Sequence, residues 1–425
     1  MSFAELRNAK PASWTTAADD LLSAAKQCER IKDDIHDNGV KPLTEDWDGA
    51  AFGAAHDALV HVADRAEVAS VLARSAVDPL DTLNQAVQIA QRELESAITF
   101  ATSRGLVTDR VTGAVTVPPT TVADLTLGFA ATEANDMITA AVAAATAADN
   151  ECAAAIGRTV SANEAHMTPE DAQEIQQNNV RAALQEMRDT IPKDATPEEV
   201  SRWWSNLAPK QQTNLEKACP VEIYRLTGIP DADKQRIDRP DQGFSSTKAV
   251  KWALEHKDDT SIDVYENNCA NFVSNALHEA GLPYKINPWK GARYDSGGWG
   301  QTPAGELNLP WGEGWDHTKS WGFAPAQKDF FLDHGGATVT PDQARPGDVV
   351  YWEYTQAGTT PDGNTMSPGL AHHAAIVTGV LPDGQVVYTQ HTPGNTDLPL
   401  DGRLPEVAMH EGQQKIEIVT PKKTW

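Results

Sequence analysis

The sequence predicts a multidomain protein: an all-α helical bundle in the N-terminal part, followed by an α+β domain with an antiparallel sheet. The first 190 residues are rich in alanine and mostly free of glycine and proline. From about residue 244, tryptophan and glycine become frequent, and segments with strand character follow. At 425 residues, the chain is long enough for two or three domains with cores of their own.

Three parts follow from these shifts in composition. Residues 1–190 are predicted to form an elongated helical bundle, and residues 244–425 a second domain. Residues 191–243 are rich in proline and aspartate, contain the pair Trp203-Trp204, and are predicted to be a linker.

The bundle is predicted from apolar residues at helical spacing, which mark the faces that pack against each other. A turn-rich, β-branched segment at 107–119 interrupts it and predicts a short ribbon. Turns are also expected at 38–42 and 47–49. The predicted helices span 15–37, 50–76, 79–103, 120–160 and 168–190.

Composition excludes several classes of function. The formal net charge is −25, and an acidic chain without a basic patch repels nucleic acid and anionic membrane surfaces. The four cysteines form no C-x-x-C pair, which argues against a zinc ribbon, although a Cys28–Cys152 disulfide stays open. We find no ordinary signal peptide and no long apolar run, which by itself predicts a cytoplasmic protein.

The turn Trp47-x-Gly49 between two predicted helices resembles the WXG100 family of small helical hairpins, which are exported by type VII secretion without a cleaved signal. The resemblance implies a secreted protein and a small WXG100-like helical partner. The family's Tyr-x-x-x-Asp/Glu export tail is absent from the helical region, so the partner would have to supply it. The alternative is a packed helical corner.

Residues 265–281 carry the strongest chemical signal. Asn268 is predicted to cap a helix whose apolar face ends at Gly281. Cys269 then lies in the first turn, where unsatisfied N–H groups and the helix dipole favour an anion. This placement predicts a lowered thiol pKa and a nucleophile. The alternative is an inert buried cysteine.

A thiolate needs a base, and His372, His373 and His391 are the candidates. Adjacent residues of a strand face opposite sides, so only one of the first two can meet Cys269. A three-residue loop at 382–384 would place His391 opposite Ala375 and diagonal to His373. A two-residue loop would favour His372 instead. We predict the former.

Several motifs now occur in one order: Cys269-Ala-Asn-Phe-Val-Ser-Asn-Ala-Leu277, Ser320-Trp321, Pro346-Gly-Asp-Val-Val350, His373-Ala-Ala-Ile-Val377 and Tyr388-Thr-Gln-His391. Over residues 244–395 they resemble the amidase family related to NlpC/P60 and CHAP cysteine peptidases. The resemblance implies a papain-like α+β fold that cleaves amide bonds, often in cell-wall peptides. It implies Cys269 as nucleophile, His373 as general base and acid, and His391 as the polar third member.

The oxyanion would be stabilised by the backbone N–H of Cys269 at the helix start. Tyr265 could add its hydroxyl group, or simply be a packed aromatic residue. The family has Asp before the cysteine where this chain has Asn268, which removes a charge. The implied mechanism needs no metal or other cofactor.

Two rival interpretations stay open. A zinc hydrolase would draw on the histidines and on Asp316 or Asp348, and a non-enzymatic secreted scaffold would only bind a partner. For the enzyme, the substrate could be a peptidoglycan peptide or a protein amide. A toxin of this kind would also need a neutralising immunity protein in the producing cell. The histidines of the zinc alternative are His317, His372, His373 and His391.

Overall fold

The computed structural model describes residues 1–47, 49–119, 125–161, 166–287, 289–303, 315–355, 357–359, 365–400 and 414–425. The chain divides into two compact units. The first contains Met1–Ala195 and Arg202–Thr213, and the second contains Thr196–Ser201 and Asn214–Trp425. Each unit is described by itself below.

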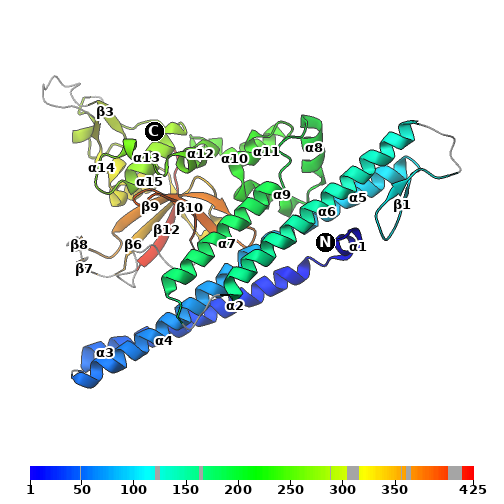
Figure 1. The fold of residues 1–425 in the computed structure, drawn as a ribbon. Helices are drawn as coiled ribbons and strands as arrows, with labels where there is room; N and C mark the ends of the chain where they lie inside the picture. Colours follow the sequence, from blue (N-terminus) through cyan, green and yellow to red (C-terminus); the bar gives the residue numbers. More distant parts are fainter. Residues whose placement is uncertain are drawn as a thin grey trace. The chain divides into compact units, whose positions relative to one another are not determined.

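Long helices build the first unit (Figure 1). Alanine dominates the faces along which α5 and α6 pack, because its small side chain allows close approach. The predicted helices are confirmed over the described residues, and the predicted ribbon forms as β1 and β2. The elements are α1 Phe3–Asn8, α2 Ala12–Ile35, the π-helix η1 His36–Val40, α3 Lys41–Asp46, α4 Ala50–Ser75, α5 Val77–Ser103, β1 Val107–Thr108, β2 Val115–Thr116, α6 Leu125–Val160 and α7 Pro169–Asp189.

One predicted turn of this unit is wrong. Residues 38–42 do not interrupt the helix, since the helical path continues through η1 and α3 to Asp46. The direction changes after Trp47, and Gly49 has a positive φ of 121°. Pro42 is tolerated because it occupies the first turn of α3, where its missing N–H has no helical partner to lose. Part of the predicted helix 120–160 lies outside the described residues, which resume at α6.

The segment predicted as a linker folds into short helices whose residues are divided between the two units. Proline opens three of them, in agreement with its preference for the first helical position. Trp203 and Trp204 are buried, and Gln212 donates a hydrogen bond to the Trp204 carbonyl at 2.7 Å. The helices are α8 Pro197–Asn206, α9 Pro209–Ala218, α10 Pro220–Arg225 and α11 Asp231–Asp238, followed by η2 Pro240–Gln242.

The second unit is α+β. Its main sheet has six strands in the order β11-β10-β9-β6-β12-β5, and neighbouring strands are antiparallel, which confirms the predicted sheet. The helices are α12 Ser246–His256, η3 Thr260–Ile262, α13 Cys269–Glu279, η4 Ala292–Tyr294, α14 Lys319–Gly322, α15 Ala324–Asp333 and η5 Pro341–Gln343. The strands are β3 Gln301–Pro303, β4 Trp315–His317, β5 Ala337–Val339, β6 Val349–Tyr354, β7 Gly358–Thr359, β8 Thr365–Met366, β9 Ala371–Val380, β10 Val386–Gln390, β11 Asn395–Pro399 and β12 Gln414–Thr420.

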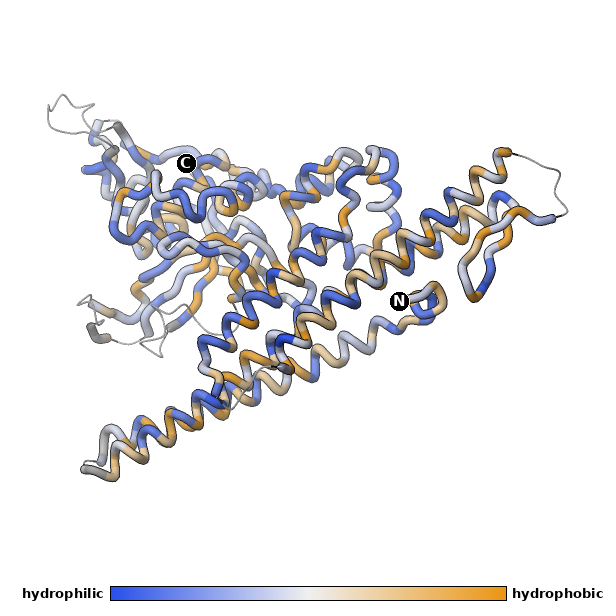
Figure 2. The backbone as a smooth tube through the Cα atoms, in the orientation of Figure 1, coloured by the Kyte–Doolittle hydropathy of each residue, from blue (hydrophilic) through white to orange (hydrophobic). Residues whose placement is uncertain are grey.

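Apolar residues occupy both faces of this sheet, and Figure 2 shows orange, hydrophobic segments along its strands. One face packs on α13 and α15 and includes Tyr351, Ala374 and Ile376. The other face forms a separate cluster that includes Trp352, Ala375 and Tyr388. Alternation along β6 and β9 therefore divides their residues between two cores.

The long loop predicted around 284–325 lies partly outside the described residues. Its described parts include η4, β3, β4 and α14. Within the described residues, none of the helices combines the length and the apolar character that crossing a bilayer requires.

Candidate active site

Cys269 is the first residue of α13, and eight of the eleven residues of this helix are buried. A buried network of hydrogen bonds fixes the position of this helix. Gln327 of α15 donates to the Ala270 carbonyl and to Ser274 Oγ, both at 2.7 Å. Ser274 Oγ in turn donates to the Trp321 carbonyl at 2.8 Å. The position of the thiol is thus set by contacts from α14 and α15 as well as by the helix.

The predicted cap is wrong in its detail. Asn268 does precede the helix, but its side chain accepts no backbone N–H of the first turn, and only the side chain of Asn271 donates to Asn268 Oδ1 from there, at 3.3 Å. Instead, Asn268 Oδ1 accepts the backbone N–H groups of Val264 and Tyr265 at 3.0 and 3.1 Å. The side chain therefore closes the loop before Cys269. The amide group of asparagine has both an acceptor and a donor, and Asn268 Nδ2 also donates to the Tyr265 carbonyl oxygen.

Burial decides the protonation of the thiol. It raises the pKa of Cys269 to about 11, and hydrogen bonds from the backbone N–H groups of Ala374, Ala270 and Cys269 oppose this rise only in part. The sequence argument considered the helix start alone and predicted a lowered pKa, which is wrong for this structure. Desolvation outweighs the helix terminus because Cys269 is only 4% exposed. The Ala374 contact places the sulfur beside the residue that follows His373.

The hairpin between β9 and β10 confirms the predicted three-residue loop. Leu381 N donates to the Gln385 carbonyl at 2.9 Å, and Gly384 has a positive φ of 98°. Val380 pairs with Val386, in the predicted register. Glycine suits this position because a Cβ atom would strain a left-handed backbone.

A β-bulge then shifts the register. Val387 pairs with Gly379, but Tyr388 pairs with Val377, so β9 contains one extra residue at Thr378. Continuing this register places Gln390, rather than His391, opposite Ala375. His373 accordingly meets Gln390, with 3.0 Å between His373 Nε2 and Gln390 Oε1. The prediction that His391 orients His373 is therefore wrong, because a one-residue slip exchanges the two faces of a strand.

Gln390 fixes the tautomer of His373. Its Nε2 donates to the Pro393 carbonyl at 3.2 Å, which leaves Oε1 as an acceptor toward the ring. His373 Nε2 must then carry the proton, and Nδ1 carries the lone pair. Burial lowers the pKa of His373 to about 4, with a hydrogen bond to Gln390 that opposes the shift and the charge of His372 that adds to it. His373 is therefore a neutral base at pH 7.

The Cys269 thiol contacts β9 at the backbone of Ala374, the residue after His373. His373 packs its ring against Trp352, with ring centroids 5.1 Å apart. Within the part of the chain that the structure describes, no hydrogen bond joins the Cys269 sulfur to a histidine ring, and His373 Nδ1 has no hydrogen-bond partner. A proton acceptor therefore lies one residue away from the backbone N–H that contacts the thiol.

The remaining candidate residues are placed elsewhere. His372 stacks on Tyr354 with 4.4 Å between ring centroids. His391 contacts Asp263 and stacks on Phe272 of α13. Tyr265 is 44% exposed and meets the His317 ring edge-on at 6.0 Å. This geometry describes Tyr265 as a packed aromatic residue at the edge of the site, and burial raises the pKa of its hydroxyl.

The donors of the zinc alternative are spread over different contacts. Asp348 is buried against Arg239, with 2.8 Å between carboxylate and guanidinium. His317 lies 3.1 Å from Gln301 Oε1. Over the described residues, His, Cys, Asp and Glu side chains nowhere gather in a group of three that could hold a metal ion.

Comparison with known protein families identifies the same region. Residues 243–419 match the family model described as "Putative amidase domain". The match spans α12, α13 and most of the main sheet, and it supports amide hydrolysis as the activity of this region. No curated protein and no solved structure matches the chain.

Proposed function

We propose that the second unit is a cysteine amidohydrolase, with Cys269 as nucleophile and His373 as general base and acid. Gln390 is the positioning residue that holds the imidazole. The observation that carries the proposal is the His373–Gln390 hydrogen bond, because it leaves a lone pair on Nδ1 next to the strand position that contacts the thiol. The match to an amidase family supports the reaction type.

The mechanism starts from a neutral pair, since the thiol pKa lies near 11 and the imidazole pKa near 4. The thiol proton passes to His373 Nδ1 as the sulfur attacks the amide carbonyl carbon. The backbone N–H of Cys269 donates to the developing oxyanion. His373 then protonates the leaving amine, and a water molecule, deprotonated by His373, hydrolyses the thioester.

Substrate and cellular context complete the proposal. Peptide amides of the cell wall are the proposed substrates, as the resemblance to NlpC/P60 and CHAP peptidases implies. The helical first unit, with its Trp47-x-Gly49 turn, is proposed to direct type VII export together with a small helical partner. A neutralising immunity protein in the producing cell follows if the enzyme acts as a toxin.

The test is amide hydrolysis by the full-length protein on cell-wall peptides and on a panel of peptide amides. Cys269→Ala and His373→Ala abolish turnover, because general acid–base catalysis alone contributes about 10²- to 10⁴-fold. His372→Ala is the matched control, since it removes the adjacent imidazole, which stacks on Tyr354. It retains activity within about threefold of the wild type. Loss of activity in His372→Ala with retention in His373→Ala would reverse the assignment of the base.

Gln390→Ala is expected to lower kcat with little change in KM, because the ring loses its orientation and its tautomer. The rate of Cys269 alkylation by iodoacetamide is expected to rise with pH, with the midpoint of the rise near the thiol pKa of about 11. A midpoint well below neutral pH would show that the resting enzyme already holds a thiolate–imidazolium pair.

A second candidate is a secreted protein whose amidase-like unit only binds a partner. It is favoured by one observation, the raised pKa of a thiol that is only 4% exposed. The two candidates differ in turnover. If no amide in the panel is cleaved and Cys269 resists alkylation throughout the pH range, the binding function replaces the enzyme.

A further inference from the structure

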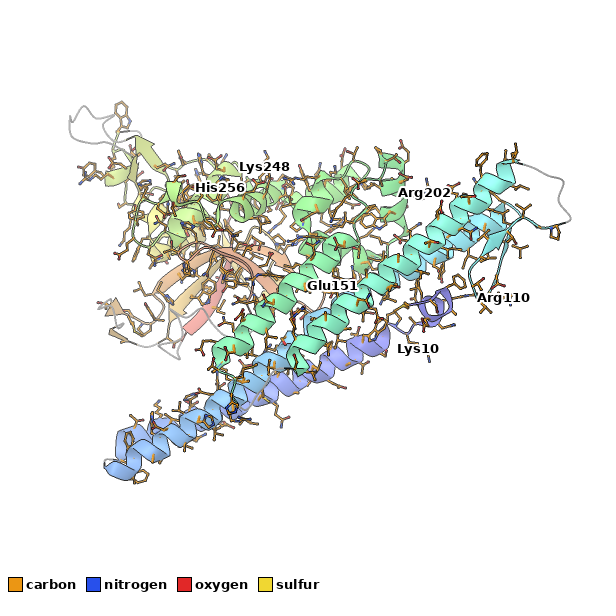
Figure 3. All side chains as sticks on the ribbon, in the orientation of Figure 1. Lys10, Arg110, Glu151, Arg202, Lys248 and His256 are labelled. Atoms are coloured by element: carbon orange, nitrogen blue, oxygen red, sulfur yellow. The ribbon has the colours of Figure 1, made fainter. Side chains whose placement is uncertain are left out.

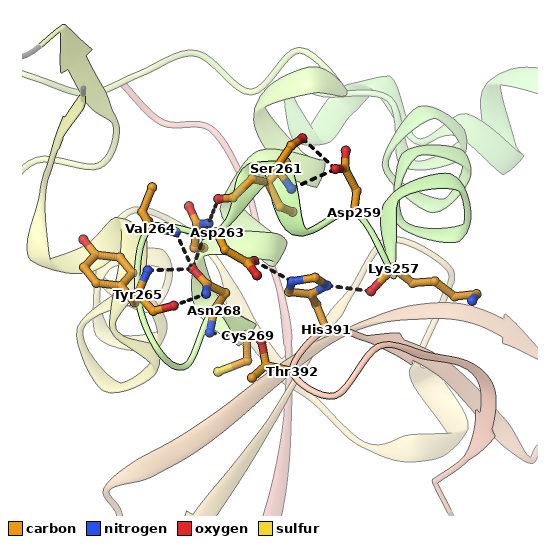
Figure 4. A network of polar contacts seen from close by, with 12 residues as sticks. Lys257, Asp259, Ser261, Asp263, Val264, Tyr265, Asn268, Cys269, His391 and Thr392 are labelled. Atoms are coloured by element: carbon orange, nitrogen blue, oxygen red, sulfur yellow. Dashed lines mark hydrogen bonds and ion pairs between the residues drawn. The ribbon is translucent and has the colours of Figure 1, made fainter. Parts of the chain in front are cut away.

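The proposed mechanism leaves His391 without a role, yet this ring is enclosed by polar partners. Its side chain is 5% exposed. Nδ1 lies 2.5 Å from the Lys257 carbonyl oxygen, and Nε2 lies 2.7 Å from Asp263 Oδ1 (Figure 4). Both partners belong to the loop 257–268, which leads directly into Cys269.

Both partners of the ring are hydrogen-bond acceptors. A neutral imidazole has a single N–H group and satisfies only one of them, whereas a doubly protonated ring donates to both. The face of the ring stacks on Phe272 of α13, with centroids 5.5 Å apart and an interplanar angle of 13°. Apolar surroundings of this kind strengthen an ion pair compared with its value in water.

The next residue holds the other end of the same loop. Thr392 has a positive φ of 66°, which is unusual for a β-branched residue. Its Oγ1 accepts the backbone N–H of Asn268 at 3.2 Å, immediately before the nucleophile. His391 and Thr392 thus contact the loop at its beginning, its middle and its end.

The end of β10 therefore touches both halves of the proposed site. Gln390 points to one face of the sheet and orients His373, whereas His391 points to the other face and contacts the Cys269 loop. The consecutive residues Gln390, His391 and Thr392 therefore contact both the proposed base, His373, and the loop before the proposed nucleophile, Cys269. A change in this segment would displace one group relative to the other.

We propose that His391 is a positioning residue for Cys269: in its doubly protonated form it ties Lys257 and Asp263 to β10, and loss of one proton releases the loop before the nucleophile. The inference rests on the proposed function only for the role of Cys269. The loop contact itself is independent of that role.

Other charged groups lie around the ring. The pKa of Asp259 is lowered mainly by hydrogen bonds from Ser261, with smaller contributions from the charges of His256 and His391. Lys257 Nζ pairs with Asp258, which offsets its charge. His256 lies at the end of α12 (Figure 3). Its ring stacks on Trp252, with centroids 4.3 Å apart. From α13, the group in contact with the ring is the apolar Phe272.

The test is amide hydrogen exchange of residues 257–268 in the full-length protein as a function of pH, expressed as protection factors. NMR of ¹³C-labelled histidine follows the protonation of His391, assigned by the loss of its signal in His391→Gln. In the wild type, protection is expected to fall about tenfold over the interval in which His391 titrates. In His391→Gln, protection is low at every pH.

His334→Gln is the matched control. His334 also stacks on a phenylalanine and contacts a carbonyl oxygen, with 2.7 Å between its Nδ1 and the Phe330 oxygen. It lies at the C-terminal end of α15, outside the loop 257–268, so its loss is expected to leave the protection of 257–268 unchanged. Equal loss of protection in both variants would show a general destabilisation and overturn the proposal.

Asp263→Asn separates positioning by charge from a purely structural role. Asparagine keeps an oxygen acceptor but removes the negative charge, so the fall in protection is expected to move to lower pH. A merely structural contact would lower protection without moving this pH. Protection that is independent of pH in the wild type, or a His391→Gln loop as protected as the wild type, would overturn the proposal.

Alkylation of Cys269 connects the loop to the nucleophile. While His391 is doubly protonated, the rate in His391→Gln is expected to differ from that in His334→Gln by about tenfold. An equal rate in the two variants would overturn the positioning role. If Cys269 is unreactive in every protein, including the wild type, the proposed enzyme fails, and the exchange data still decide whether His391 holds the loop.

Discussion

The helix that carries Cys269 and the helical hairpin at 26–62 are built in opposite ways. In α13, eight of eleven residues are buried, and hydrogen bonds with α14, α15 and the preceding loop fix its position. In the hairpin, none of the described residues between 26 and 62 is buried, although it contains about half of α2 and of α4. The short helix therefore has the larger share of tertiary contacts.

This difference shows that length and rigidity are separate properties of a helix. Most of the stability of a helix in a protein comes from the packing of its apolar face rather than from its intrinsic propensity. The helix that carries Cys269 lies in a core, which fixes the position of this residue. The hairpin exposes apolar residues such as Ile31 and Val62 to solvent, so its length adds little to the core.

The largest effect is expected for Phe272→Ala. The ring is fully buried between α12 and His391, so its removal is expected to destabilise the protein by about 3–5 kcal/mol. Phe323→Ala is the matched control, because Phe323 is 43% exposed, and it is expected to cost about 1 kcal/mol or less. Urea unfolding followed by tryptophan fluorescence measures both. Equal losses of stability in Phe272→Ala and Phe323→Ala would contradict the distinction between a buried and an exposed phenylalanine.

A smaller effect, with a defined pH dependence, is expected at Glu186 in the part of the first unit that is packed. Burial, with the charges of Glu151 and Asp189, raises the pKa of Glu186 from 4.5 to about 7. The folded state thus binds this proton more tightly than the unfolded state, and stability falls as pH rises from about 4.5 through 7. Glu186→Gln is therefore expected to be more stable than the wild type at pH 8, by on the order of 2 kcal/mol.

The same comparison at low pH supplies the check. Below the pKa of about 4.5, the wild-type carboxyl group is protonated in both states, and the advantage of Glu186→Gln disappears. Glu133→Gln, at an exposed position of α6, is expected to change the free energy of unfolding by less than about 0.5 kcal/mol at either pH. A gain for Glu186→Gln that is independent of pH would contradict the proposed cause.

The smallest effect is expected in the hairpin. Ile31 is 44% exposed, so Ile31→Ala in the isolated chain is expected to cost less than about 1 kcal/mol. Leu94→Ala, at a buried position of α5, is the contrasting variant and is expected to cost about 2–5 kcal/mol. Unfolding at several protein concentrations tests both. A large, concentration-dependent cost at Ile31 would show that the hairpin is covered by a second molecule in solution.

The sequence predicted those parts of the fold that depend on local pattern. The helices of the first unit follow from apolar spacing, and the loop at 382–384 follows from Pro382-Asp383-Gly384. The continuous helical path through 36–46 was missed, because Gly39 and Pro42 suggest a turn whereas the proline occupies a helical first turn. Local turn signals can therefore fail where a helix restarts at once.

The sequence predicted Cys269 and His373 as residues of the candidate site, but Gln390 was not predicted. Its neighbour His391 had the more suggestive side chain, and an uninterrupted register would have placed that residue beside His373. The bulge at Thr378 exchanges the two. No residue in the β10 segment signals this slip, because a bulge in β9 depends on how both strands pack against their neighbours.

The sequence by itself determined the order of elements, the placement of the cysteine at the start of a helix, and the histidine on the strand that follows. The tertiary structure decided the protonation states of Cys269 and His373 and the hydrogen-bond partners of both residues. Burial raises the thiol pKa of Cys269 to about 11 against the effect of the helix terminus, and the β-bulge places Gln390 against His373 and His391 against the loop before Cys269. Both decisions depend on desolvation and strand register, which arise from residues far apart in the chain.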